Sequence, residues 1–157
     1  MSKLLFQEQV ERWGMLEVSC QGPAEGNPFV DHHIQGVFTG EKETVKTDGF
    51  YDGDGVYKVR FMPSFEGSYR FTISADFLEK EETGSFVSLP AGEGNHCPVR
   101  VADTYHFAYE DGTRYYSIGT TCYVWDLQSD ERIAQTLETL KASAFNKIRF
   151  CIFPKHY

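Results

Sequence analysis

A chain of 157 residues is long enough for one full domain with a hydrophobic core and too short for two large ones. Hydrophobic residues make up 41% of it and charged residues 24%, which argues against wholesale disorder. The net charge of −8 argues against a nucleic-acid partner, because phosphate binding needs a basic surface. No segment is apolar for long enough to span a bilayer, so no membrane partner is expected.

The first two-thirds of the chain predicts short β-strands joined by tight turns. The 13 Phe, 9 Tyr and 14 Gly favour this class, because aromatic side chains suit a pleated, half-buried surface. Residues 10–18, with Trp13, form the first candidate strand, and residues 29–39 form the second. A short strand around 44–46 precedes a dense turn signal at 48–55.

The clearest alternation in the sequence follows this turn signal. Two runs place apolar residues at every second position, namely Tyr57, Val59 and Phe61, then Tyr69, Phe71 and Ile73. Such runs put one face on a core and the other in water, and their short Gly-containing connection predicts a hairpin. With further strands at 84–89 and 98–101, residues 1–102 are predicted to form an immunoglobulin-like antiparallel β-sandwich.

The character of the sequence changes over residues 103–157. Asp111-Gly112 between apolar runs at 105–109 and 114–118 predicts a hairpin. Ser129 is a candidate helix N-cap, and an apolar stripe follows at helical spacing, made of Ile133, Leu137, Leu140 and Ala144. An apolar strand over 148–153 ends at Pro154, so strand, helix and strand predict one βαβ unit with parallel strands.

That unit cannot bury both of its faces alone, because parallel sheets are normally covered on each side. We therefore expect Tyr157 to be an internal point of a longer protein. In the chain as given, we expect the exposed edges and apolar faces of this segment either to pack on the sandwich or to pair with a second copy, which would give a homo-oligomer.

Cofactor and metal sites are not expected. The four cysteines and the pairs His32-His33 and His96-Cys97 lack the spacing of a zinc site, and Asp-Gly turns explain the acidic run at 48–54 better than calcium does. Residues 1–10 lack the apolar stretch of a signal peptide. We expect a cytoplasmic location, with a parent protein that has lost its leader as the alternative.

Several motifs, taken in order, resemble a known group of enzymes. Residues 49–63 with 66–69 resemble the immunoglobulin-like domain that precedes the barrel in many bacterial glycoside hydrolases. The runs 105–107, 111–113, 118–125 and 145–149 resemble the start of the catalytic (β/α)₈ barrel, and Asn146-x-x-Arg149 is similar to a strand common among clan-A retaining glycosidases. Residues 103–157 are on this basis expected to be the first strands and helix of a truncated barrel.

The resemblance implies where a substrate would bind. Active sites of such barrels lie at the carboxyl ends of the strands. Tyr123 and Trp125 would stack on sugar rings, and Arg149 would orient a nucleophilic carboxylate or pair with a structural one. Three further candidates, Lys155, His156 and Tyr157, would line the pocket of the intact parent or simply form a frayed terminus.

No catalytic residue is assigned within the chain. The resemblance implies catalytic Glu residues at the ends of the fourth and seventh barrel strands, and this chain reaches only the second. The expected function is therefore that of an inactive N-terminal part of a retaining glycoside hydrolase acting on a polysaccharide or oligosaccharide. The alternatives are a carbohydrate-binding sandwich and a sandwich that serves only in packing or oligomerisation.

Overall fold

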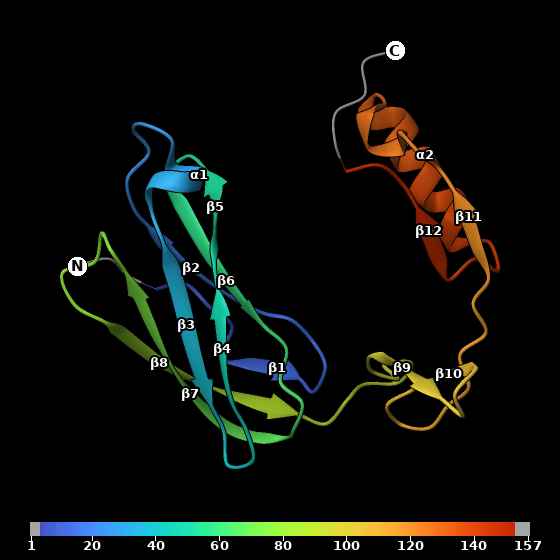
Figure 1. Ribbon diagram of the computed structural model, residues 1–157, viewed down its shortest axis with the longest axis horizontal. Helices are drawn as coiled ribbons and strands as arrows, with labels where there is room; N and C mark the ends of the chain where they lie inside the picture. Colours follow the sequence, from blue (N-terminus) through green and yellow to red (C-terminus); the bar gives the residue numbers. More distant parts are fainter. Residues whose placement is uncertain (1–3, 153–157) are drawn as a thin grey trace. The chain divides into compact units, whose positions relative to one another are not determined.

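The computed structural model describes residues 4–152, which divide into two compact units between Cys97 and Pro98 (Figure 1). The prediction of a mainly β chain is confirmed. The division falls before the predicted boundary at residue 102, because the strand β9 (Val99–Ala102) pairs within the second unit.

The first unit consists of two sheets and a short helix (Figure 1). The larger sheet has the strand order β1 (Gln9–Glu11), β8 (Glu82–Leu89), β7 (Gly67–Ala75), β3 (Ile34–Thr39) and β4 (Thr44–Asp48). The smaller sheet has the order β2 (Leu16–Gln21), β6 (Val56–Phe61) and β5 (Phe50–Gly53), and the helix is α1 (Pro28–Asp31). The pairs are antiparallel as predicted, except that β1 runs parallel to β8.

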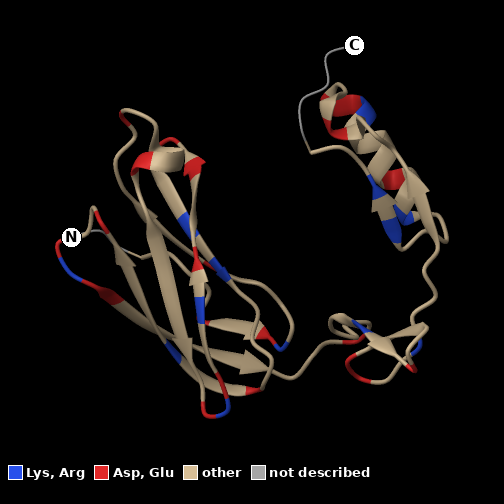
Figure 2. Ribbon diagram, in the orientation of Figure 1, with Lys and Arg blue, Asp and Glu red and all other residues tan. Residues whose placement is uncertain are grey.

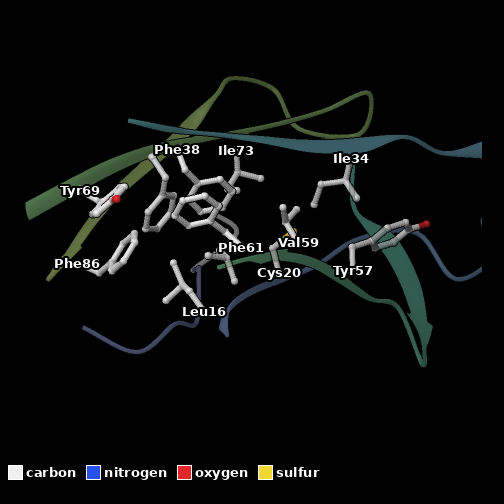
Figure 3. Close-up of a cluster of buried hydrophobic side chains, with 12 residues drawn as sticks. Leu16, Cys20, Ile34, Phe38, Tyr57, Val59, Phe61, Tyr69, Ile73 and Phe86 are labelled. Carbon is white, nitrogen blue, oxygen red and sulfur yellow. The ribbon is translucent and has the colours of Figure 1, made fainter. Parts of the chain in front are cut away.

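The core lies between these two sheets, which makes the first unit a β-sandwich. The predicted inward residues of β6 and β7 are all buried, and they meet residues of β2, β3 and β8 across the core (Figure 3). Phe38 of β3 and Phe61 of β6 stack with ring centroids 4.5 Å apart. Period-two alternation therefore identified the core-facing side of both strands.

Between β4 and β5 the chain passes from one sheet to the other at a single glycine. Gly49 is the only residue between β4 of one sheet and β5 of the other, and its N–H donates to the Ile34 carbonyl at 2.8 Å. A Cβ at this position would lie 2.5 Å from the Lys58 carbonyl oxygen and 2.7 Å from Ile34 Cγ2. The close approach of three chain segments explains why a glycine stands at this corner.

Two predicted strands of the first unit are wrong in their extent. Residues 10–18 do not form one strand, because Trp13 adopts a φ of 62° and the chain turns between β1 and β2. Residues 29–39 begin as the helix α1, with Pro28 in its first turn, and become a strand only at Ile34. Proline suits the first turn of a helix, because its fixed φ and missing N–H cost nothing there.

The second unit contains the predicted βαβ arrangement. The strand β11 (Gly119–Thr121) runs parallel to β12 (Lys147–Arg149), and between them lie the 3₁₀ turn η1 (Trp125–Leu127) and the helix α2 (Asp130–Lys141) (Figure 1). Ser129 is at the N-cap position of α2 as predicted, without a side-chain capping bond. Among the described residues, none of the helices has both the length and the apolar character needed to cross a bilayer.

The hairpin predicted across Asp111-Gly112 is present but short. The run 114–118 meets the strand β10 (His106–Tyr109) through an antiparallel bridge between Ala108 and Arg114, and the Tyr115 N–H donates to the Phe107 carbonyl at 3.1 Å. The longer pairing of β10 is with β9. The turn itself is present, since the Gly112 N–H donates to the Tyr109 carbonyl at 2.9 Å. A turn motif fixes a local reversal of the chain and does not by itself select a strand's partner.

Candidate functional site

The parallel pairing of β11 and β12 brings the predicted site residues Tyr123 and Arg149 to one edge. Thr121 is the register partner of Arg149. Beyond the strands the backbone ladder continues, because the Cys122 N–H donates to the Arg149 carbonyl and the Cys151 N–H donates to the Tyr123 carbonyl, both at 2.9 Å. The carboxyl ends of both strands are therefore joined side by side.

The side chains at this edge form two aromatic contacts. The Arg149 guanidinium carbon lies 5.6 Å from the centroid of the Tyr123 ring, which is a cation–π distance. The Trp125 ring meets Phe150 edge to face, with centroids 5.9 Å apart. Trp125 is half-buried, whereas Arg149 is exposed and pairs with no carboxylate within residues 4–152. This surface combines one exposed cation with aromatic rings.

Asn146 holds the opposite ends of the same strands together. Its Oδ1 accepts a hydrogen bond from the Ile118 N–H at 3.0 Å, and its Nδ2 donates to the Tyr116 carbonyl at 2.7 Å. The Asn146 N–H also donates to the Ile118 carbonyl at 2.9 Å. The asparagine of the Asn-x-x-Arg motif therefore fixes where β12 starts relative to β11, and Arg149 follows one strand length later.

Two buried polar atoms next to this edge have no hydrogen-bond partner among the described residues. They are Trp125 Nε1 and Asp126 Oδ1, both in η1. Buried polar atoms in proteins are nearly always satisfied, so these two mark a place where a polar group is expected to approach. Asp126 itself is half-buried in the 3₁₀ turn.

The remaining predicted site residues, Lys155, His156 and Tyr157, lie outside the described residues. Within residues 4–152, no group of three or more His, Cys, Asp or Glu side chains is placed to hold a metal ion. Of the six predicted residues, the structure thus brings Tyr123, Trp125 and Arg149 to the carboxyl ends of β11 and β12.

A second candidate region, which sequence reasoning missed, lies in the first unit. A hollow of about 520 Å³ opens where α1, the start of β3, the Gly49 corner and the end of β7 meet. Its lining includes Phe29, His32, Tyr51 and Asp76, which are separated by up to 47 positions in the chain. The sequence analysis considered the pair His32-His33 and the acidic run 48–54 separately, and nothing in the sequence indicated that Asp76 lies next to His32.

The polar side of this hollow is built around Asp76. Its Oδ1 lies 3.3 Å from His32 Nδ1, and its Oδ2 accepts a hydrogen bond from the His33 N–H at 3.3 Å. The His32 ring packs edge to face against Tyr57 and Phe77. Burial raises the pKa of the Tyr57 phenol, and its hydroxyl donates to the Pro23 carbonyl at 3.0 Å. The imidazole is thus held in place by contacts on several sides.

Charged residues elsewhere in the first unit form balanced groups. On the smaller sheet, Glu17 lies between two cations, with Oε1 3.0 Å from Lys58 Nζ and Oε2 2.8 Å from Arg60 Nε. Hydrogen bonds from Arg60 and Lys58 lower the pKa of Glu17, and those to Asp52 and Glu17 raise the pKa of Lys58. Figure 2 shows basic and acidic residues interspersed along these strands.

Comparison with known proteins gives a match to a family of domains and a match to a solved structure. Residues 9–76 match a family described as "Domain of unknown function (DUF5060)". No curated protein matches the chain. A solved structure from Bacteroides vulgatus ATCC 8482, described as a "putative glycoside hydrolase", is 39% identical to this chain with a TM-score of 0.87.

The match to the solved structure covers nearly all of this chain but a much smaller part of the other protein. The match covers 96% of this chain and 30% of the Bacteroides vulgatus protein. A "putative beta-galactosidase" from Bacteroides fragilis is 12% identical with a TM-score of 0.34, over 99% of this chain and 25% of that one; a similarity this low carries no argument. The chain is therefore similar along nearly its whole length to a protein described as a "putative glycoside hydrolase", of which it spans 30%.

Proposed function

We propose that this chain is the first part of a glycoside hydrolase, with an immunoglobulin-like accessory sandwich followed by the opening strands of a (β/α)₈ barrel. The observation that carries the proposal is the parallel pair β11 and β12, joined through α2, with Tyr123, Trp125 and Arg149 at its carboxyl end. A (β/α)₈ barrel is built from such units, and its active site forms at that end of the strands. The 39% identity to the Bacteroides vulgatus protein supports the same assignment.

Each residue at the strand ends has a chemical role in this proposal. Tyr123 and Trp125 present rings on which the apolar C–H face of a sugar can stack. Arg149 is exposed and has no carboxylate partner among the described residues, so its charge is available to a group that the rest of the protein supplies. A guanidinium beside a nucleophilic carboxylate favours its ionised form and lowers its pKa.

The catalytic carboxylates are, on this proposal, contributed by later strands of the barrel. Retaining glycosidases need two carboxyl groups about 5–5.5 Å apart, one as nucleophile and one as acid/base. Lys155, His156 and Tyr157 follow β12 in the sequence, so we assign them to the same substrate pocket. The unsatisfied Trp125 Nε1 and Asp126 Oδ1 would then bond to polar groups of the completed barrel.

The proposal is tested on the native gene product that contains this chain, assayed for release of reducing sugar from a panel of polysaccharides and aryl glycosides. We expect hydrolysis, and we expect Arg149→Ala to lower kcat/KM by roughly 10²–10³-fold, the usual cost of removing one preorganised electrostatic group. The acid limb of the pH–rate profile should move to higher pH, because the nucleophile loses the cation that lowers its pKa.

Lys141→Ala is the matched control, since it removes a cation from the same unit at the exposed end of α2. It should leave kcat/KM and the pH profile unchanged. A folded gene product that hydrolyses none of the panel would contradict the proposed function. An Arg149→Ala variant with wild-type kinetics would contradict the role given to Arg149.

A further inference from the structure

The hollow at the end of the sandwich has the size and the mixed lining of a small-ligand site. Its volume of about 520 Å³ lies within the range typical of ligand pockets, about 300–1,000 Å³. Phe29, Phe50 and Tyr51 supply aromatic surface, while His32, Asp48 and Asp76 supply polar groups. All of these residues belong to the first unit, so the site does not depend on the strand ends described above.

The polar side of the hollow presents a defined hydrogen-bonding pattern. The Asp76 carboxylate accepts a hydrogen bond from the His33 N–H and is placed to accept a second one from a protonated His32 Nδ1. An imidazole that donates through Nδ1 keeps Nε2 as its acceptor when neutral. Nε2 makes no hydrogen bond to any described residue, so it remains available to a hydroxyl group of a ligand.

The apolar side of the hollow is an aromatic surface that water still reaches. Phe29 is 72% exposed on the four-residue helix α1. Tyr51 supports its ring edge to face, with centroids 5.1 Å apart. A large exposed aromatic ring supported by a second ring is a common way to present a flat apolar surface to a ligand.

The floor of the hollow is closely packed. Tyr57 is buried beneath it and anchored to the Pro23 carbonyl. The Gly49 corner leaves no space for a side chain, since a Cβ would meet the Lys58 carbonyl oxygen at 2.5 Å. A site that is held in shape before binding loses little conformational entropy when a ligand enters.

We propose that this hollow binds one residue of a neutral oligosaccharide. A pyranose has an apolar C–H face, which Phe29 can cover. It also has hydroxyl groups that can donate hydrogen bonds to His32 Nε2 and to the Asp48 carboxylate. The two carboxylates in the lining and the net charge of −8 disfavour uronate or sulfated sugars, because like charges repel. The first unit would thereby hold carbohydrate by itself.

The test is saturation-transfer-difference NMR on the 157-residue chain with cellotetraose, xylotetraose and mannotetraose, and with trigalacturonate as the anionic comparator. We expect at least one neutral tetrasaccharide to bind and trigalacturonate not to bind. Titration should shift the imidazole resonances of His32. Phe29→Ala and His32→Ala should each weaken the binding by roughly tenfold or more, as loss of a central contact does.

Val30→Ala is the matched control, because Val30 is the exposed neighbour of Phe29 in α1 and does not line the hollow. It should bind like the wild-type chain, and circular dichroism should show all three variants folded. Three results would overturn the proposal: no neutral tetrasaccharide binds, binding is unchanged in folded Phe29→Ala and His32→Ala, or trigalacturonate binds more tightly. None of these results bears on hydrolysis by the gene product.

Discussion

Phe38 and Phe29 belong to the same unit and have opposite surroundings. Phe38 is completely buried, stacks on Phe61 at 4.5 Å and meets Phe71 at 5.5 Å between ring centroids. Phe29 is mostly exposed on α1. Because burial and packing set the contribution of a side chain to stability, the same substitution should have very different effects at the two positions.

Phe38→Ala should lower the free energy of unfolding by about 3–5 kcal/mol, through lost transfer energy and an unfilled cavity. Phe29→Ala should change it by less than about 0.5 kcal/mol. Urea unfolding followed by tyrosine and tryptophan fluorescence measures both values. Equal losses in the two variants would show that the core does not lie where the structure places it.

Individual residues also show which features could be predicted from the sequence and which could not. The alternation of Tyr57, Val59 and Phe61 was sufficient to predict their burial, because period-two patterns report directly on a strand's two faces. The left-handed backbone at Trp13 was not predictable, since a bulky residue rarely adopts that conformation. The contact of His32 with Asp76 was not predictable either, because it joins positions 44 residues apart.

At the scale of the elements, the strands β2, β6 and β5 share a row of charges on their outer face. Glu17 on β2 bonds to Lys58 and Arg60 on β6, and Lys58 also lies 2.6 Å from Asp52 on β5. The pKa of Glu17 is lowered from 4.5 in the folded chain by these cations. The folded state therefore binds this proton more weakly than the unfolded state does.

Glu17→Gln should accordingly reduce stability at neutral pH and not in acid. The contribution of Glu17 to the free energy of unfolding is fully present above the pKa of this residue in the unfolded chain. It is lost as the pH falls through the lower pKa of Glu17 in the folded chain. Because the group is partly exposed, the loss at pH 7 should be less than about 1 kcal/mol. The measurement is the free energy of unfolding of both chains between pH 7 and the acid range.

Glu66→Gln provides the control, since Glu66 is exposed in the turn before β7 and makes no hydrogen bond or ion pair to any described residue. It should not change the free energy of unfolding. A Glu17→Gln difference that stays constant or grows as the pH falls would contradict the charge network.

The relation between β11 and β12 depends on Asn146, which bonds to Tyr116 and Ile118 through its side chain. Asn146→Ala should speed amide hydrogen exchange at Ile118 by roughly tenfold, because the N–H loses its acceptor and the strand start loosens. Asn95→Ala, which removes comparable side-chain bonds to Arg12 and Cys97 in the first unit, should leave Ile118 unchanged. Unaltered exchange at Ile118 in Asn146→Ala would contradict the role of the Asn146 side chain in holding the starts of β11 and β12 together.

The elements themselves were more predictable than their partners. The helix α2 and its flanking strands followed from local signals, namely an N-cap residue, an apolar stripe and a terminal apolar run. The pairing of β9 with β10 and of β1 with β8 did not, because strand pairing depends on contacts between distant parts of the chain. The candidate site residues came from the resemblance, and three of them, Tyr123, Trp125 and Arg149, lie at or just beyond the carboxyl ends of β11 and β12.

At the scale of the whole molecule, the second unit leaves much apolar surface uncovered. No residue of α2 is buried, and the large exposed apolar residues of the strands and their flanks include Ile118, Phe145, Phe150 and Ile152. A parallel sheet is normally covered on both faces. We propose that further β/α units of the barrel cover these surfaces in the intact protein, and that a second copy would cover them in the 157-residue chain alone.

The most direct test of the central claim is the sequence of the native gene beyond the codon for Tyr157. We expect the reading frame to continue through several more β/α repeats, with two carboxylic residues at the carboxyl ends of later strands, where a retaining mechanism needs them. A stop codon immediately after Tyr157 would contradict the claim. The chain would then lack the paired carboxylates of a glycosidase, and the sugar-binding hollow of the sandwich would have to account for its function.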